Sequence, residues 1–274
     1  MRFKGTAALA AVFIGIVFYY FLIDLPSEKL KQEEKDREEK VILFDTENVK
    51  AISFIKGENT ITLKRLGTDE WHMTAPISAK GDAATVLDFV SFLNNLNFTR
   101  VVEESPKDLT PFGLDTPDLK IILSMDNGET KGVRVGDDHP MGNKVYLALL
   151  DGSRVLAAGV TKNRLDKKVH DLRDKTILDF KVPQITKIEF IRNGKTLSLK
   201  KNDKSWEVSE GKISVKGNET EITNLLNTIQ AAQIEQFVEE QPEQLSSYGL
   251  NNSKLTVQLT SSNTKEPLTL LIGR

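Results

Sequence analysis

The sequence predicts an α+β protein: an N-terminal transmembrane helix, then two tandem copies of a β-rich unit, each an antiparallel sheet with a packed helix. Two observations lead to this prediction. An uncharged N-terminal run is long enough to cross a bilayer, and a phrase that begins at Val101, VVEESPKDLTPFGLDTPDLKIIL, returns in altered form from Phe237 as FVEEQPEQLSSYGLNNSKLTVQL. A chain of 274 residues is long enough for two domains with cores of their own.

The first predicted element, within residues 1–25, is a membrane anchor. Arg2 and Lys4 precede 18 uncharged residues, at positions 6–23. At about 1.5 Å per residue this run is roughly 27 Å long, close to the hydrocarbon thickness of a bilayer. Because the cationic flank is N-terminal, we expect the N-terminus in the cytoplasm and the body of the protein outside the cytoplasmic membrane.

A cleaved signal peptide is the alternative interpretation of this run. Such a peptide has a shorter apolar region and small residues before the cut, and FYYFLIDLPSEK has no such site. The sequence therefore favours an anchor that stays attached, with the lipid bilayer as its partner.

Residues 26–44 are predicted to form a charged helical stalk. Eleven of the fourteen residues from Ser27 to Lys40 are charged, and both signs alternate. Such a segment has no apolar face to bury, so it is typical of a solvated helix that holds the body away from lipid. A binding role for the charge run is the alternative.

Two units follow, at residues 45–180 and 181–274. Each begins with a predicted hairpin, VKAISFIKGENTITLKR from Val49 and ITKIEFIRNGKTLSLKK from Ile185, in which alternating strands flank a Gly/Asn turn. Trp71 and Trp206 each indicate a third strand.

A helix is predicted next in each unit. GDAATVLDFVSFLNNLNF and GNETEITNLLNTIQAAQI carry apolar residues at spacings of three and four, for example at Val86 and, 136 residues later, at Ile222. Asp82 and Asn218 stand at the N-cap positions. The matched spacing predicts that both helices pack on the same kind of sheet.

The repeated phrase itself is expected to be structural. In each unit a strand should lead to a pair of glutamates, Glu103–Glu104 or Glu239–Glu240, and an irregular passage should then end in an aromatic–Gly–Leu turn in which Gly permits a positive φ. Adjacent glutamates on a strand point to opposite faces, so we expect solvated carboxylates and not a catalytic dyad. The residues of the two turns are Phe112, Gly113, Leu114, Tyr248, Gly249 and Leu250.

The first unit continues beyond Gly136 with a predicted hairpin, NKVYLALLDGSRVLAAG, and a predicted helix over residues 161–177, whereas the second ends at Arg274. We therefore expect the second copy to be incomplete at its C-terminus. Either the chain is a truncated piece of a longer protein, which we favour, or its last strand, PLTLLI, is an open edge that another chain can extend.

The anchor, the repeated unit, LTPFGLDTP and VHDLRDKTI together resemble the domain-of-unknown-function 4340 family. The likeness extends from Val49 to Arg274. It implies a bacterial membrane-anchored protein whose gene often lies beside those of an ABC transporter and a gliding-motility-type auxiliary protein. It transfers no catalytic residues.

The sequence gives little sign of enzymatic chemistry. It contains no cysteine, which excludes disulfides and thiolate zinc sites, and its net charge of −2 gives no reason to expect nucleic acid as a partner. G-x-S-x-G, P-loop and H-E-x-x-H motifs are absent from the sequence. We expect no cofactor and no catalysis.

The three histidines are the remaining candidates. His72 adjoins a tryptophan on a predicted strand and is expected to be packed or half-exposed, while His170 lies among charges on a predicted helix. His139 follows Asp137 and Asp138, and two carboxylates with an imidazole are a weak candidate site for a divalent cation. A polar loop between strands has the same composition.

Three hypotheses for function remain. The first is a non-catalytic extracytoplasmic accessory or scaffold subunit of an ABC-transporter-like membrane complex, in contact with its permease, ATPase or auxiliary subunit. The second is a stand-alone module that binds peptidoglycan or a polysaccharide, although such modules usually expose a row of aromatic residues and this chain has two Trp and four Tyr. The third is a hydrolase, which a pocket that gathers His139, Asp137 and Asp138 would favour.

Overall fold

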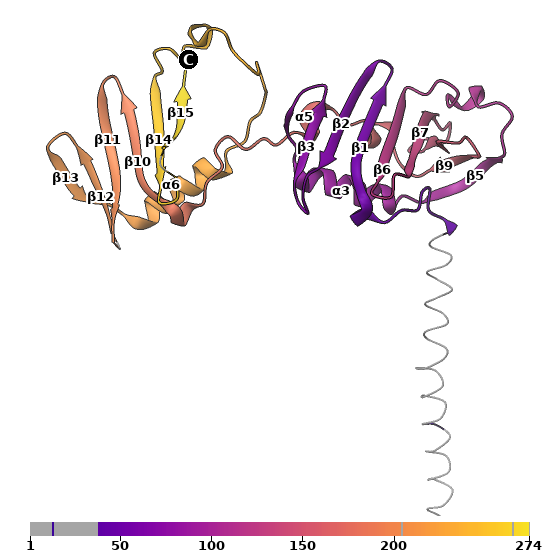
Figure 1. The fold of residues 1–274 in the computed structure, drawn as a ribbon, viewed down its shortest axis with the longest axis horizontal. Coiled ribbons are helices and arrows are strands. Elements are labelled where there is room, and N and C mark those ends of the chain that lie inside the picture. The colour runs from indigo at the N-terminus through magenta and orange to yellow at the C-terminus, as the bar shows by residue number, and fades with distance from the viewer. Residues whose placement is uncertain (1–12, 14–37, 204, 265, 274) are drawn as a thin grey trace, which may run out of the picture. The chain divides into compact units, whose positions relative to one another are not determined.

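The chain forms two compact units, Met1–Asp174 and Lys175–Arg274, slightly before the expected division between residues 180 and 181. The structure, a computed structural model, describes Phe13 and residues 38–203, 205–264 and 266–273. Each unit contains one antiparallel sheet and few helices (Figure 1). The expectation of an α+β fold built on antiparallel sheets is confirmed.

The predicted anchor, Phe13 apart, and residues 26–37 of the predicted stalk lie outside the described residues. In the part of the chain that the structure describes, no helix is long and apolar enough to span a bilayer. The last residues of the predicted stalk belong to the first unit. Lys40 forms a β-bridge with Asn97, and the buried Val41 donates its N–H to the carbonyl oxygen of Leu96 at 2.8 Å.

The sheet of the first unit has nine strands in the order β4-β3-β2-β1-β6-β7-β8-β9-β5. Among its described residues the helices are α3 (Ala83–Asn94), α4 (Lys162–Leu165) and α5 (Val169–Leu172), with 3-10 turns η2 (Thr46–Asn48) and η3 (Thr110–Phe112). The strands are β1 (Val49–Lys56), β2 (Asn59–Arg65), β3 (Trp71–Ala75), β4 (Ala79–Lys80), β5 (Phe98–Glu104), β6 (Leu119–Met125), β7 (Thr130–Asp138), β8 (Val145–Leu149) and β9 (Arg154–Ala158).

The core of this unit lies between the sheet and α3. Alternate residues of β1 and β6 are buried because successive side chains of a strand point to opposite faces. The helix begins at Asp82, whose carboxylate accepts the N–H of Thr85 at 3.0 Å. Phe54 of β1 and Phe89 of α3 place their ring centroids 5.1 Å apart. The helix face that packs there consists of Val86, Phe89, Val90 and Leu93.

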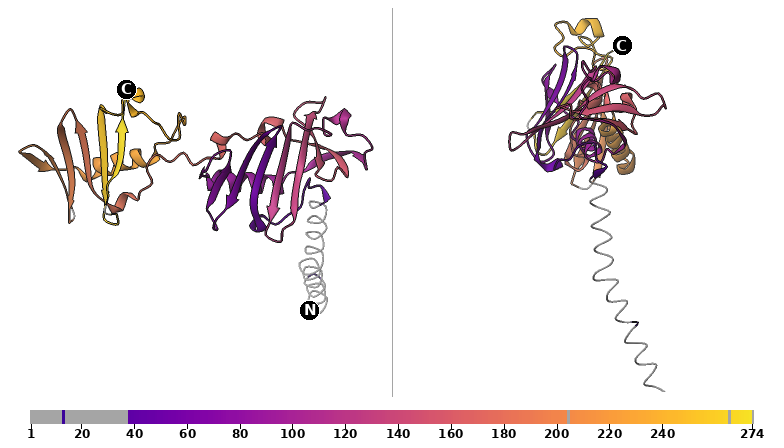
Figure 2. Two further views of the ribbon diagram at one scale, coloured as in Figure 1. Left: turned by 45° about the horizontal axis from the view of Figure 1, so that its top comes forward. Right: turned by 90° about the vertical axis from the view of Figure 1, so that its right-hand side faces the viewer.

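The sheet of the second unit has six strands in the order β13-β12-β11-β10-β14-β15, shown from two further sides in Figure 2. Helix α6 (Glu219–Ala231) buries Ile222 and Leu226, and Asn218 caps its N-terminus. The 3-10 turns are η4 (Val182–Gln184) and η5 (Leu245–Tyr248). The strands are β10 (Ile185–Arg192), β11 (Lys195–Asn202), β12 (Ser205–Glu210), β13 (Ile213–Lys216), β14 (Leu255–Ser261) and β15 (Leu268–Ile272).

Strand pairing has the same register in the two sheets over their first strands. Residue pairs between β1 and β2 recur 136 positions later between β10 and β11, as Ile52–Leu63 and Ile188–Leu199 illustrate. The pairing of each first strand with the strand that follows the aromatic–Gly–Leu turn, β1 with β6 and β10 with β14, also shifts at matching positions. These shifts lie between Val49 and Ala51 and between Ile185 and Lys187.

Two details of the sequence prediction are wrong. The helix predicted over residues 161–177 is two short helices, because the backbone between them is extended at Asp166 and Lys168. The strand expected before Glu239 is also missing: residues 236–239 are irregular. In the first unit the corresponding strand β5 is held by β9, and the described strands of the second unit end at β15 without a counterpart of β9.

Candidate functional site

The aromatic–Gly–Leu turns have the same backbone conformation in both units. Gly113 has φ +65° and donates its N–H to Thr110 O at 3.0 Å. Gly249 has φ +69° and donates to Ser246 O at 3.0 Å. A left-handed backbone of this kind explains why glycine stands at both positions. The sequence prediction of a glycine turn matches the geometry.

A second glycine lies behind each turn. A Cβ added to Gly136 would lie 2.2 Å from the carbonyl oxygen of Phe112, and one added to Gly273 would lie 2.2 Å from that of Tyr248. Leu114 is fully buried, and its second-unit counterpart Leu250 is half-buried. The two turns therefore lock a strand end by close packing and present no reactive group.

The two tryptophans also occupy matching places. Trp71 in β3 and Trp206 in β12 are both buried. The guanidinium carbon of Arg65 and the ammonium nitrogen of Lys201, 136 residues apart, each lie 5.9 Å from the indole centroid of their own unit. Among the described residues, Trp71 Nε1 has no hydrogen-bond partner. These contacts give the tryptophans a packing role.

The weak metal candidates are not gathered into a ligand set. Asp137 and Asp138 are exposed at the end of β7, and the carboxyl group of Asp137 packs against Gly113. His139 accepts the N–H of Met141 at Nδ1 (3.1 Å) and lies 5.0 Å from the Tyr146 ring. No group of three His, Asp or Glu residues suited to a metal ion occurs within the residues that the structure describes.

The other two histidines lie in local surroundings. His72 Nε2 is 2.9 Å from Ser78 Oγ, and its side chain is half-buried, as the sequence suggests. His170 lies exposed in α5.

The paired glutamates bind different partners. Glu104 holds Arg154 of β9 through two guanidinium nitrogens, with Nη2–Oε1 at 2.7 Å. The hydrogen bond from Arg154 lowers the pKa of Glu104, and the same contact raises the pKa of Arg154. In the second unit Tyr248 donates its hydroxyl to Glu239 at 2.6 Å, which raises the pKa of Tyr248. The first pair links the neighbouring strands β5 and β9, and the second ties the irregular passage at Glu239 to the η5 turn.

One family model, described as a domain of unknown function (DUF4340), matches residues 71–253. The chain belongs to the DUF4340 family. This confirms the resemblance seen in the sequence, and the match takes in parts of both units. Neither the curated proteins nor the solved structures contain a match.

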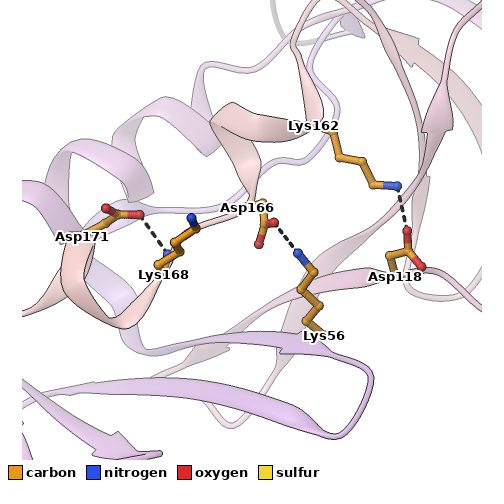
Figure 3. A network of polar contacts seen from close by, with 6 residues as sticks. All are labelled: Lys56, Asp118, Lys162, Asp166, Lys168 and Asp171. Atoms are coloured by element: carbon orange, nitrogen blue, oxygen red, sulfur yellow. Dashed lines mark hydrogen bonds and ion pairs between the residues drawn. The ribbon is translucent and has the colours of Figure 1, made fainter.

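This DUF4340 protein has a polar network that the sequence did not predict (Figure 3). The ammonium group of Lys56, at the end of β1, pairs with Asp166, which follows α4. Lys162 of α4 pairs with Asp118 at 3.0 Å, and this contact, with a smaller effect of Lys56, lowers the pKa of Asp118. Lys168 donates its backbone N–H to Asp171 at 2.9 Å. The network fastens the α4–α5 segment to the sheet.

The sequence also did not predict the surface that the second unit leaves open. Three apolar side chains of its sheet are solvent-exposed: Leu197 (37%), Ile213 (71%) and Val215 (57%). The counterparts of Leu197 and Ile213 in the first unit, Ile61 and Ile77, are half-buried and pack on the core. The hydropathy pattern alone gives no signal for this difference, since it depends on what covers the sheet.

The first unit also has an open groove of about 1030 Å³. It lies between residues 38–43 and the β6–β7 and β8–β9 turns, and its charged lining residues carry both signs. Lys131 spans part of it by donating to the carbonyl oxygen of Leu43 at 2.9 Å. None of Asp137, Asp138 and His139 lines it.

Proposed function

We propose that this protein is a non-catalytic, extracytoplasmic accessory subunit of an ABC-transporter-like membrane complex. It binds other subunits through its sheet edges and is held at the bacterial cytoplasmic membrane by its N-terminal helix. The resemblance to the DUF4340 family implies a gene that often lies beside those of an ABC transporter. We propose this class of complex for that reason.

The observation that carries the proposal is the set of exposed apolar side chains on the second unit. Ile213 (71%) and Val215 (57%) lie on the edge strand β13. Exposed apolar residues on sheet edges favour association with another protein, because an unpaired strand offers both hydrogen-bonding groups and apolar surface. A binding role uses this surface, whereas a hydrolase needs a gathered set of reactive groups.

The proposal includes a tandem origin for the two units. The shared register over β1–β2 and β10–β11, the matched shifts near Val49 and Ile185, and the paired glycines behind each turn support it. A repeated packing design without a repeated set of reactive side chains is typical of a scaffold.

The proposed orientation places the N-terminus in the cytoplasm and both units in the periplasm. Since the sequence has no cysteine, single cysteines report their own location. A membrane-impermeant maleimide applied to cells with a permeabilised outer membrane should label Lys195→Cys and should leave Gly5→Cys unlabelled until the cells are lysed. Labelling of both positions before lysis, or of neither position, contradicts the orientation.

Affinity purification tests the proposed complex. The full chain carries a C-terminal tag, membranes of the native host are solubilised in mild detergent, and bound proteins are identified by mass spectrometry. We expect an ABC permease, its ATPase or the auxiliary protein to be enriched over an untagged control. Recovery of the tagged chain without any of them contradicts the proposal, and co-sedimentation with purified sacculi would point instead to envelope binding.

A further inference from the structure

One face of the first unit's sheet carries cations and hydroxyl groups. Helix α3 packs on the opposite face, where Ile52 and Phe54 of β1 are buried. Residues directly opposite each other on neighbouring strands point to the same side of a sheet, so the register of the strands defines the rows of this face. The row that crosses β4, β3, β2, β1, β6 and β7 consists of Lys80, His72, Lys64, Ala51, Ser124 and Thr130.

Two further rows lie on the same face. Thr62, Ser53 and Ile122 lie opposite one another in the middle row, and the hydroxyl oxygens of Ser53 and Thr62 are 3.0 Å apart. The last row consists of Thr60, Ile55, Lys120 and Arg134. The residues named in the three rows are exposed or half-buried, and none of them is Asp or Glu.

The cations of this face differ in what holds them. Lys80, at the margin, pairs with Asp174 at 2.9 Å. Arg134 donates Nη2 to the carbonyl oxygen of Leu150 at 2.6 Å, which leaves its positive charge without a counter-charge. Among the described residues Lys64 and Lys120 have no ion-pair partner. Three positive charges on this face are therefore uncompensated.

The matching face of the second unit is neutralised. Glu189 stands where the first unit has Ser53, and it pairs with Lys187 of the same strand at 2.8 Å. Glu207 adds a second carboxylate, directly opposite Lys200. The two faces have the same strand register but not the same charge. The cationic face is therefore specific to the unit that directly follows the predicted anchor.

The composition of this cationic face favours a flat, anionic ligand over a protein. Its largest apolar residues, Ile55 and Ile122, are half-buried, whereas the centre of a protein interface is usually formed by aromatic residues, Met or Arg. Lysine and arginine are attracted to anionic lipid headgroups. A bilayer is within reach, because residues 24–37, between the predicted anchor and the described part of the unit, span at most about 50 Å.

We propose that the cationic face of the first unit rests on the anionic headgroups of the bilayer that the N-terminal helix spans. The proposal rests on the proposed function, which holds the chain at the membrane, and adds a second contact with lipid. Lipid phosphates accept hydrogen bonds from Lys64, Lys120 and the neighbouring hydroxyl groups. The anchor gives the headgroups a high effective concentration, so a small number of cations suffices. This arrangement requires that the predicted stalk does not hold the unit beyond reach of the headgroups.

Reconstitution in vesicles tests this contact. The full chain, which has no cysteine of its own, carries Ser124→Cys with a fluorescent label, and the vesicles contain a lipid with a nitroxide quencher on its headgroup. One set consists of phosphatidylcholine, and the other of equal parts of phosphatidylcholine and phosphatidylglycerol. Flotation first establishes that the anchor holds the chain in both sets.

We expect quenching at low salt to be about threefold or more stronger in the vesicles with phosphatidylglycerol, because only these attract the cations. High salt should reduce it to the level seen with phosphatidylcholine alone, since salt screens charges that are exposed to solvent. The counterpart of Ser124 in the second unit is Thr260, and a label on Thr260→Cys should be quenched equally in both sets.

Charge variants of the labelled chain locate the contact. Lys64→Glu with Lys120→Glu should abolish the excess quenching. Ser53→Glu, which copies the second unit, should reduce it. Lys195→Glu with Lys200→Glu makes the same change in net charge on the second unit, so it is the matched control and should leave quenching unchanged. Circular dichroism should confirm that all variants stay folded.

Four results would overturn the proposal. The first is equal quenching of the Ser124→Cys label in both vesicle sets, and the second is excess quenching that survives Lys64→Glu with Lys120→Glu. The third is relief of quenching by inorganic phosphate at constant ionic strength, because the face would then be a site for free phosphate. The fourth is absence of lipid-dependent quenching together with lost recovery of ABC subunits by the double variant, which would assign the face to a protein.

The result is distinguishable from failure of the proposed function. Absence of flotation in both vesicle sets contradicts the anchor and this contact together. Flotation with equal quenching in both sets refutes only the contact and leaves the accessory role standing. Lipid-dependent quenching, without recovery of ABC subunits from native membranes by the unchanged chain, supports the contact and contradicts the accessory role.

Discussion

The carbonyl oxygen of Phe112 packs so closely on Gly136 that a Cβ at Gly136 would lie 2.2 Å from it. The same contact joins Tyr248 and Gly273 in the second unit, at the same distance. In each unit the turn with the left-handed glycine precedes one strand, β6 or β14. The turn packs against the end of the strand that pairs with it, β7 or β15. The repeated phrase in the sequence therefore supplies one side of a close contact, and a single glycine, Gly136 or Gly273, supplies the other side.

Gly136→Ala should destabilise the first unit by about 1–3 kcal/mol, the usual cost of overpacking a tight contact. The obstructing atom is a backbone oxygen, so relief requires the strand or the turn to move. Gly273→Ala should have the same effect on the second unit. Urea unfolding of the full chain, followed by circular dichroism, measures both.

Gly159→Ala is the control for these substitutions, because a Cβ there would meet Thr99 Cγ2 at 3.6 Å, an ordinary contact. It should change the unfolding midpoint little. Equal stability of Gly136→Ala and Gly159→Ala would contradict the close packing of the turn.

The Glu104–Arg154 pair predicts a pH-dependent stability. The folded pKa of Glu104 is lowered by its hydrogen bond from Arg154. A lowered carboxyl pKa contributes stability that is present above the ordinary value of 4.5 and is lost as the pH falls through the folded pKa. The wild type should therefore unfold at a higher temperature than Glu104→Gln at neutral pH, and the difference should disappear in acid.

Glu103→Gln removes the same charge from the neighbouring position of β5, on the other face of the strand. Its difference from the wild type should be smaller and should not follow the same acid transition. A Glu104→Gln variant as stable as the wild type at neutral pH would show that the ion pair adds nothing measurable.

The hairpins at Val49 and Ile185 could be predicted from the sequence because their signal is local. Alternating side chains around a Gly or Asn turn specify two strands and their register without reference to the rest of the chain. The helices α3 and α6 are equally local, since Asp82 and Asn218 cap them and apolar spacing defines one face. The turn glycines could be predicted for the same reason.

The α4–α5 segment and the open surface could not be predicted in this way. Residues 161–177 have a charge pattern typical of a helix, but Asp166 pairs with Lys56, 110 residues earlier in the chain, and the backbone is extended there. Ile213 and Ile77 are the same residue type 136 positions apart, but Ile213 begins β13 and is exposed, whereas Ile77 lies in the bend before β4 and packs on the core of its unit. Long-range pairing of this kind leaves no periodic signal in the sequence.

Tyr248 should titrate above its ordinary pKa of 10.0, because its hydroxyl donates to Glu239 and ionisation would place two negative charges together. Glu239→Gln should lower the pKa of Tyr248 towards that value. The absorbance of tyrosinate during an alkaline titration, compared between the wild type and the variant, isolates this residue among the four tyrosines.

Glu243→Gln, in the same irregular passage, serves as the control for that titration. It should leave the tyrosinate curve as in the wild type. Superimposable curves for the wild type and Glu239→Gln would contradict the contact between Tyr248 and Glu239.

Photo-crosslinking in the native host can show whether the second unit binds a subunit of a membrane complex. A photoreactive amino acid replaces Ile213 in one strain and its first-unit counterpart Ile77 in another, and the adducts are identified by mass spectrometry. We expect Ile213 to give an adduct with an ABC permease, ATPase or auxiliary protein and Ile77 to give none. No adduct from Ile213, or the same adduct from both positions, would contradict it.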